Sequence, residues 1–127
     1  MRVAICFLLL LFAFSITSCK EEYKNINPYI FNKKIRSNNK IKTPTDLIIA
    51  YDTTLAHGYD GRLLVTRKKL EGDKLEITAI ITINDDDEIK AEKYLMVVEH
   101  SGTAWNVLEI QHNWKCYEGY GHTDWGI

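Results

Sequence analysis

The C-terminal half of the chain alternates between apolar and polar positions, a pattern typical of strands with one buried face. The alternation is clearest over residues 75–83, where an apolar residue stands at every second position. Similar stretches at residues 62–70, 94–99 and 104–117 predict three further strands, the middle one beginning near residue 89. Because turn-forming residues separate the four stretches, we expect an antiparallel meander.

A helical pattern precedes the strands. Thr43 can cap a helix that begins at Pro44, and Asp46 complements the positive end of the helix dipole. Four apolar residues then recur at helical spacing: Leu47, Ile48, Tyr51 and Leu55. Gly58 is a natural end, so we predict a helix of about three and a half turns. The fold class that follows is α+β, an N-terminal helix packed on a four-stranded antiparallel meander sheet.

The first 18 residues have the pattern of an export signal. Arg2 is followed by an unbroken apolar run over residues 3–14, which is too short to span a bilayer as a helix. The next segment, Ile16-Thr17-Ser18-Cys19, resembles the lipobox of bacterial lipoproteins. This resemblance implies cleavage before Cys19 and diacylation of that cysteine. It also implies a membrane anchor and a location at the outer membrane or the cell surface.

Charge divides the remaining chain into two parts. Residues 20–42 contain seven Lys or Arg and two Glu, a net charge of +5, and we predict that residues 19–42 form a lipidated, basic tether. Asn27 and Pro28 can begin a short helix there, which would bury three apolar side chains: Ile30, Phe31 and Ile35. Residues 43–127 contain eight Lys or Arg and 15 Asp or Glu, a net charge of −7, and form the predicted single domain.

Two further resemblances concern fold and sorting. The order of the elements predicted within residues 43–117 resembles the cystatin-like and NTF2-like folds, in which a curved sheet wraps a helix and leaves a conical pocket. This resemblance rests on element order and implies no site residue. The run Lys20-Glu21-Glu22 resembles an export tag of surface-exposed lipoproteins, and it equally suits the charged start of a tether. The acidic domain disfavours nucleic acid and favours a basic protein partner.

Aromatic residues are concentrated near the C-terminus, where five fall within 21 positions: Trp105, Trp114, Tyr117, Tyr120 and Trp125. The stretch from Trp114 onward resembles the tail of small uncharacterised bacterial lipoproteins, which implies no particular activity. Tyr120, His122, Asp124 and Trp125 follow the last predicted strand, beside glycines, and suit contact with a sugar ring or an apolar small molecule. His122 and Asp124 are alternatively an acid–base pair at the mouth of a pocket.

His112 and Cys116 share the apolar face of the last predicted strand with Leu108, Ile110 and Trp114. We therefore expect a core histidine, hydrogen-bonded to backbone, and a buried thiol. Residues four apart on a strand lie about 13 Å apart, too far to share one metal ion. We predict no metal site and no cofactor. Cys116 is the last cysteine left after signal cleavage and lipidation, so it is either buried or bridges two chains.

These features favour a non-enzymatic binding protein that is anchored outside the cytoplasm. It would hold a basic protein, as an inhibitor or immunity protein does, or a small ligand. The chain lacks the motifs of serine hydrolases, zinc proteases and phosphate-binding loops. Two different roles stay open: an enzyme with an NTF2-like pocket that uses His122 and Asp124, and a structural component of the envelope.

Overall fold

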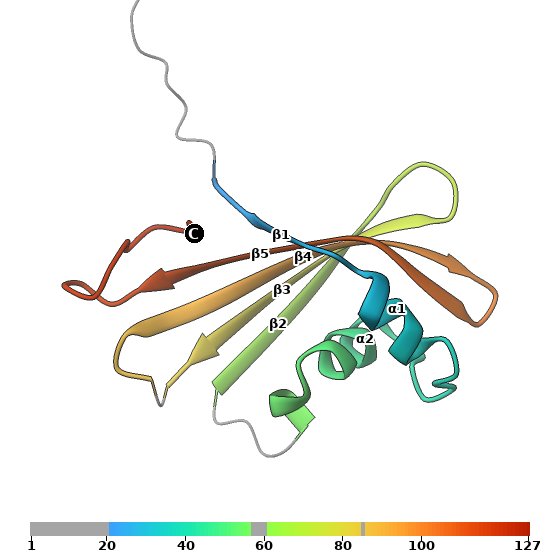
Figure 1. Ribbon diagram of the computed structural model, residues 1–127, viewed down its shortest axis with the longest axis horizontal. Helices are drawn as coiled ribbons and strands as arrows, with labels where there is room; N and C mark the ends of the chain where they lie inside the picture. The colour runs from blue at the N-terminus through green and yellow to red at the C-terminus, as the bar shows by residue number, and fades with distance from the viewer. Residues whose placement is uncertain (1–20, 57–60, 85) are drawn as a thin grey trace, which may run out of the picture.

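The computed structural model describes residues 21–56, 61–84 and 86–127 of the chain. The predicted signal, Cys19 and the predicted helix end at Gly58 lie outside these residues. The sheet has five antiparallel strands in the order β1-β5-β4-β3-β2. Their bounds are β1 (Lys24–Ile26), β2 (Gly61–Lys69), β3 (Lys74–Ile83), β4 (Ile89–Ser101) and β5 (Ala104–Cys116). Two helices, α1 (Tyr29–Ile35) and α2 (Pro44–Tyr51), lie together on one face of this sheet (Figure 1).

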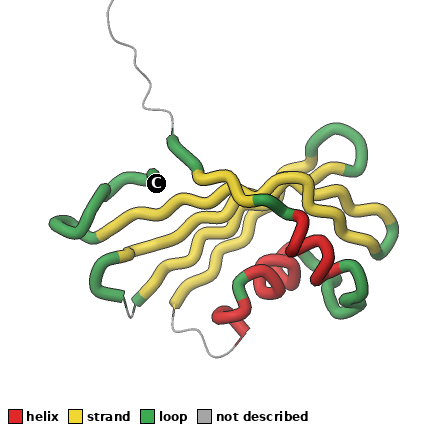
Figure 2. Tube along the Cα trace, viewed as in Figure 1, coloured by secondary structure: helices red, strands yellow, loops and turns green. Residues whose placement is uncertain are grey.

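The prediction of an α+β fold with an antiparallel sheet is confirmed, while the sheet has five strands rather than the predicted four and packs against two helices rather than one. Figure 2 shows β1 and α1 preceding the meander, in the segment predicted as a basic tether. Lys24 pairs with His112 and Ile26 with Ile110, so β1 extends the sheet beyond β5. Residues 24–35 thus belong to the folded domain rather than to a tether.

Helix α1 is the short helix expected near Pro28, with one difference in its packing. Phe31 and Ile35 are buried against the sheet as expected, whereas Ile30 is 73% exposed. Pro28 caps the helix without a side-chain hydrogen bond, and Asn27 instead accepts a bond from the Tyr29 amide at 2.9 Å. Seven residues make only two turns, so one face alone can contact the core.

Helix α2 begins where the sequence predicts and ends earlier. The Thr43 hydroxyl accepts a hydrogen bond from the Asp46 amide at 3.1 Å, and the Asp46 carboxylate accepts one from the Thr43 amide at 2.9 Å. This reciprocal capping box fixes the first turn. Asp52 then adopts an extended conformation that ends the helix at Tyr51, and a 3₁₀ turn follows at η1 (Thr53–Ala56). No helix in the described ranges is long and apolar enough to cross a membrane.

The core lies between the helices and one face of the sheet. The alternation predicted for β3 is confirmed, since Ile77, Ala79 and Ile81 are buried there. A register shift between β4 and β5 breaks the alternation predicted for the last strand. The buried side chain is therefore Val107, whereas Leu108 is only half-buried, because the bulge moves one residue out of the pairing.

Candidate functional site

The four residues predicted to contact a ligand have separate surroundings. Tyr120 and Asp124 are exposed to solvent. Nε2 of His122 lies 2.8 Å from the backbone oxygen of Trp114, so the imidazole holds the C-terminal segment against β5. The ring of Trp125 lies over the Nζ atoms of two lysines on the sheet. No ion pair joins His122 to Asp124 among the described side chains.

The C-terminal segment folds back along the edge of β5. Trp114 and Gly126 exchange both backbone hydrogen bonds, at 3.0 and 3.1 Å, and the Cys116 amide donates to the oxygen of His122 at 2.8 Å. Gly121 makes the return possible, because a Cβ atom there would lie 2.9 Å from the Cys116 sulfur. Cys116 is a buried free thiol, which is one of the two arrangements expected for it.

His112 lies in the aromatic part of the inner face. Its ring stacks on Tyr94, with centroids 4.6 Å apart, and Trp114 follows at 5.5 Å. Nε2 of His112 is buried without a hydrogen-bond partner and lies 3.5 Å from a carboxylate oxygen of Glu92. A separation of 3.5 Å is longer than a normal hydrogen bond between these atoms. The expected bond from His112 to backbone is absent on this nitrogen. Burial, followed by the charge of Glu92, raises the pKa of Tyr94.

A second polar group occupies the opposite face of the sheet, where no helix lies. We call it the Lys93 cluster: Glu21, Tyr23, Lys93, Asn113 and Trp125. Lys93 and Asn113 pair across β4 and β5, and both are buried. The Lys93 ammonium forms an ion pair with Glu21, and its Nζ lies 4.3 Å from the Trp125 ring centroid. Asn113 donates to the Glu21 carboxylate at 2.8 Å and to the Glu22 backbone oxygen at 3.1 Å.

The electrostatics of this cluster follow from its burial. Burial alone would raise the pKa of Glu21, but hydrogen bonds from Lys93 and Asn113 and the lysine charge outweigh it, and the pKa is lowered. Burial and the neighbouring Glu21 charge raise the pKa of Tyr23 to about 12. Glu21 is thus an ionised partner of a buried lysine. The Glu21 carboxylate therefore stabilises the domain, independently of any sorting role of Lys20-Glu21-Glu22.

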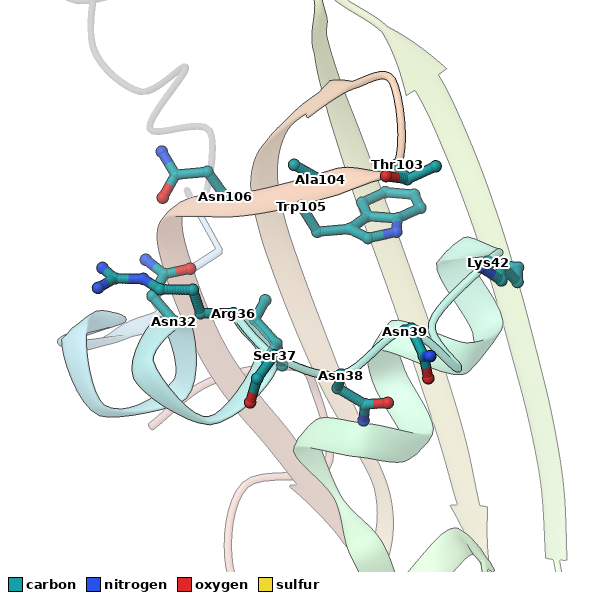
Figure 3. Close-up of a pocket in the computed structure, with 11 residues that line it drawn as sticks. Asn32, Arg36, Ser37, Asn38, Asn39, Lys42, Thr103, Ala104, Trp105 and Asn106 are labelled. Carbon is teal, nitrogen blue, oxygen red and sulfur yellow. The ribbon is translucent and has the colours of Figure 1, made fainter.

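A cleft of about 460 Å³ opens between the α1–α2 connection and the hairpin that joins β4 to β5. Figure 3 shows Arg36 and Lys42 at its two ends, with the indole of Trp105 between them. Hydroxyl and amide side chains line the space between the two cations, among them Ser37 and Asn39. Arg36 and Lys42 form no ion pair within the described part of the chain. The cleft is therefore cationic within an acidic domain.

The walls of the cleft are held in place by hydrogen bonds and stacking. The Trp105 indole donates to the Ile41 backbone oxygen at 3.2 Å and stacks on His100, with centroids 3.9 Å apart. Asn32 exchanges two hydrogen bonds with the backbone of Val107, at 2.7 and 2.8 Å, and so ties α1 to β5. A ligand would meet a wall that is already formed.

Sequence reasoning placed candidate residues elsewhere and missed this cleft. Arg36 and Lys42 lie in the predicted tether, and the sequence assigns Trp105 no role beyond membership of the five C-terminal aromatic residues. The useful signal was a basic stretch that can contain a helix, followed directly by the well-capped helix at Thr43. No group of three potential metal ligands occurs among the described residues.

Comparisons with known proteins identify no relative: no family model, curated protein or solved structure matches this chain.

Proposed function

We propose that this protein is a non-enzymatic binding protein, anchored to a membrane outside the cytoplasm through a lipidated Cys19. The observation that carries the binding role is the cleft beside Trp105, where Arg36 and Lys42 form no ion pair among the described residues and amides and hydroxyls surround them. Cations and neutral donors together suit a small polar molecule that bears a carboxylate or a phosphate. An acidic sugar combines those groups with a face that can rest against the indole.

The location at the outer membrane or the cell surface is part of the same proposal. The lipobox-like segment before Cys19 supports it, because two acyl chains give stable membrane attachment. We also retain the resemblance to cystatin-like and NTF2-like folds as a proposal. The helices on one sheet face support it, while the position of β1 beside β5 departs from the element order predicted from sequence.

Calorimetric titration of the chain lacking its signal tests the binding role. The ligands are glucuronic acid and glucose 6-phosphate, with glucose as the neutral control. We expect R36Q or K42Q to weaken binding of the acidic sugars about ten- to hundredfold, because a charge-assisted hydrogen bond contributes about 1.5–3 kcal/mol. The matched control is K33Q, since Lys33 is exposed on α1 outside the cleft. Equal affinity for glucose, or equal losses in all three variants, would exclude the cleft as an anion site.

A basic protein partner is the second candidate, favoured by the charge at the opposite end of the sheet. There the Tyr117 amide donates to the Glu88 backbone oxygen at 2.9 Å, which brings the acidic β3–β4 loop beside Glu118. Association through this end would weaken with salt and in E118Q. Binding that is unchanged by salt would oppose it.

An enzymatic role and a purely structural role have weaker support. His122 is engaged with backbone, so a pocket enzyme using His122 and Asp124 would need that bond to open. A structural component bridged through Cys116 would need the buried thiol to become accessible.

A further inference from the structure

The folded domain begins two residues after Cys19. Glu21 already bonds to Lys93 and Asn113, and Asn113 also holds the backbone of Glu22. Two residues of extended chain span about 7 Å, so a lipid on Cys19 would lie close to this part of the domain. Any direct contact between domain and bilayer rests on the lipid anchor of the proposed function. Such a contact replaces a free tether with a domain held against the membrane.

Aromatic and apolar side chains lie along the C-terminal segment, which folds back along β5 so that Ile127 comes beside the point where the chain enters the domain. We call this surface the aromatic end: Tyr117, Tyr120, Trp125 and Ile127. Ile127 lines one hollow together with Glu21 and Glu22, and Trp125 covers Lys93. Figure 1 shows the C-terminus beside the beginning of β1. Glu21, where the described chain begins, and Ile127 therefore lie on the same side of the molecule.

Three of these side chains face solvent: Tyr120 is 60% exposed, Ile127 53% and Tyr117 37%. Tyrosine and tryptophan are enriched where the hydrocarbon of a bilayer meets water, because each combines an apolar ring with a polar group. We propose that the aromatic end contacts the interfacial region of the membrane that holds the Cys19 lipid. The occupant of this surface is the bilayer, because the described chain begins at Glu21, beside Ile127 and only two residues after the proposed lipid-bearing Cys19.

The charges around the aromatic end indicate which lipid it prefers. Glu118 and Asp124 are exposed there, as is Lys90, which lines one hollow with Tyr117 and Glu118, and Lys115 lies over the Trp125 ring, 4.8 Å from its centroid. These two carboxylates and two ammonium groups balance, so anionic head groups gain no net attraction. We therefore expect docking on zwitterionic lipid without a requirement for anionic lipid.

The orientation that follows places the cleft away from the membrane. The aromatic end follows Cys116 at one end of β5, and the cleft lies at Ala104 and Trp105 at the other end. Thirteen residues of strand span about 40 Å. A ligand arriving from the aqueous side would thus meet the cleft first.

Fluorescence quenching in lipid vesicles tests the contact. The lipidated protein, which begins at Cys19, is reconstituted into phosphatidylcholine vesicles with brominated acyl chains, and the emission added by a new tryptophan is measured. The variant is Y120W and its matched control is Y29W, since Tyr29 is also an exposed tyrosine, 67% exposed on α1. We expect the emission added by Y120W to be quenched at least threefold more strongly than that added by Y29W.

Metabolic labelling with palmitate separates the two proposals. Labelling that is lost in C19S supports the anchor, whereas an unlabelled Cys19 refutes the anchor and the docking together. Labelled protein in which Y120W is quenched no more than Y29W refutes the docking alone. That second result includes the case in which the aromatic end binds an envelope protein, since pure vesicles contain none.

Discussion

The replacement of Glu21 by glutamine is the sharpest test of where the domain begins. The substitution keeps the shape of the side chain and removes its charge, which leaves Lys93 without its carboxylate partner. Breaking a fully buried ion pair costs about 3–5 kcal/mol. The Lys93 side chain is 10% exposed and that of Glu21 35%, so water screens the pair in part. The Trp125 ring also remains over the ammonium and retains about 1 kcal/mol.

We therefore expect E21Q to lower the free energy of unfolding by about 2 kcal/mol, which for a domain of this size lowers Tm by about 8 °C. Circular dichroism melts at pH 7 measure it. The matched control is E22Q, because Glu22 is exposed and only its backbone oxygen is engaged. K93M and the double variant complete a cycle, in which the double loss should be smaller than the sum of the single losses.

The difference in Tm between wild type and E21Q should also depend on pH in a defined direction. The pKa of Glu21 is lower in the folded chain than its ordinary value of 4.5, so the ionised carboxylate stabilises the fold above that value. This stabilisation is lost as the pH falls through the lowered pKa. The gap in Tm between wild type and E21Q should thus be full above about pH 5.5 and shrink below pH 4.5. Identical melting of E21Q and wild type at pH 7 would mean that residues 21–23 are a tether after all.

Three further predictions concern local features of the fold. Thr43→Ala removes one half of the capping box of α2 and should cost about 1 kcal/mol in urea unfolding. Gly121→Ala should destabilise more than Gly119→Ala in the same assay, because a Cβ atom meets a buried sulfur at 2.9 Å at the first position and nothing within 4 Å at the second. Trp125→Ala should lower the unfolding free energy by about 1–2 kcal/mol, whereas Tyr120→Ala should leave it unchanged; the reverse order would contradict the packing described for this segment.

Elements with a strong local signal could be predicted from the sequence. The buried positions of β3 follow from strict alternation, and the start of α2 follows from three capping signals at Thr43, Pro44 and Asp46. The first helix and the first strand carry weaker signals. Strand β1 has three residues, and its pairing depends on β5, which lies about 80 residues further along the chain. No local pattern reports such a partner.

The candidate site could not be predicted from local sequence patterns either, because its residues lie far apart along the chain. The cleft joins Arg36 and Lys42 to Trp105, and the wall between them depends on Asn32 bonding to Val107 across 75 residues. The net charge of +5 over residues 20–42 is typical of a solvated segment, so the sequence predicted a tether where the structure has part of the folded domain. Long-range hydrogen bonds hold this segment on the sheet, because buried polar groups without a partner would cost free energy.

The edge of β5 explains why both ends of the chain fold onto this sheet. An uncovered edge offers free backbone groups to other chains, and β1 covers only three residues of it. Asn32 satisfies both backbone groups of Val107, and Gly126 does the same for Trp114. The opposite edge, β2, pairs with no second strand among the described residues and instead carries Lys68 and Lys69, charges that oppose pairing with another strand.

The role of the N-terminal segment in covering the β5 edge limits how the proposed lipid anchor can be connected to the domain. The segment that begins at Glu21 cannot leave the sheet as a tether without uncovering part of the β5 edge and breaking the ion pair of Lys93 and the hydrogen bonds of Asn113. Both losses act in the same direction, so the N-terminal segment should stay bound when the protein is attached to a membrane. A short connection between lipid and domain is therefore a consequence of how the sheet protects its edge.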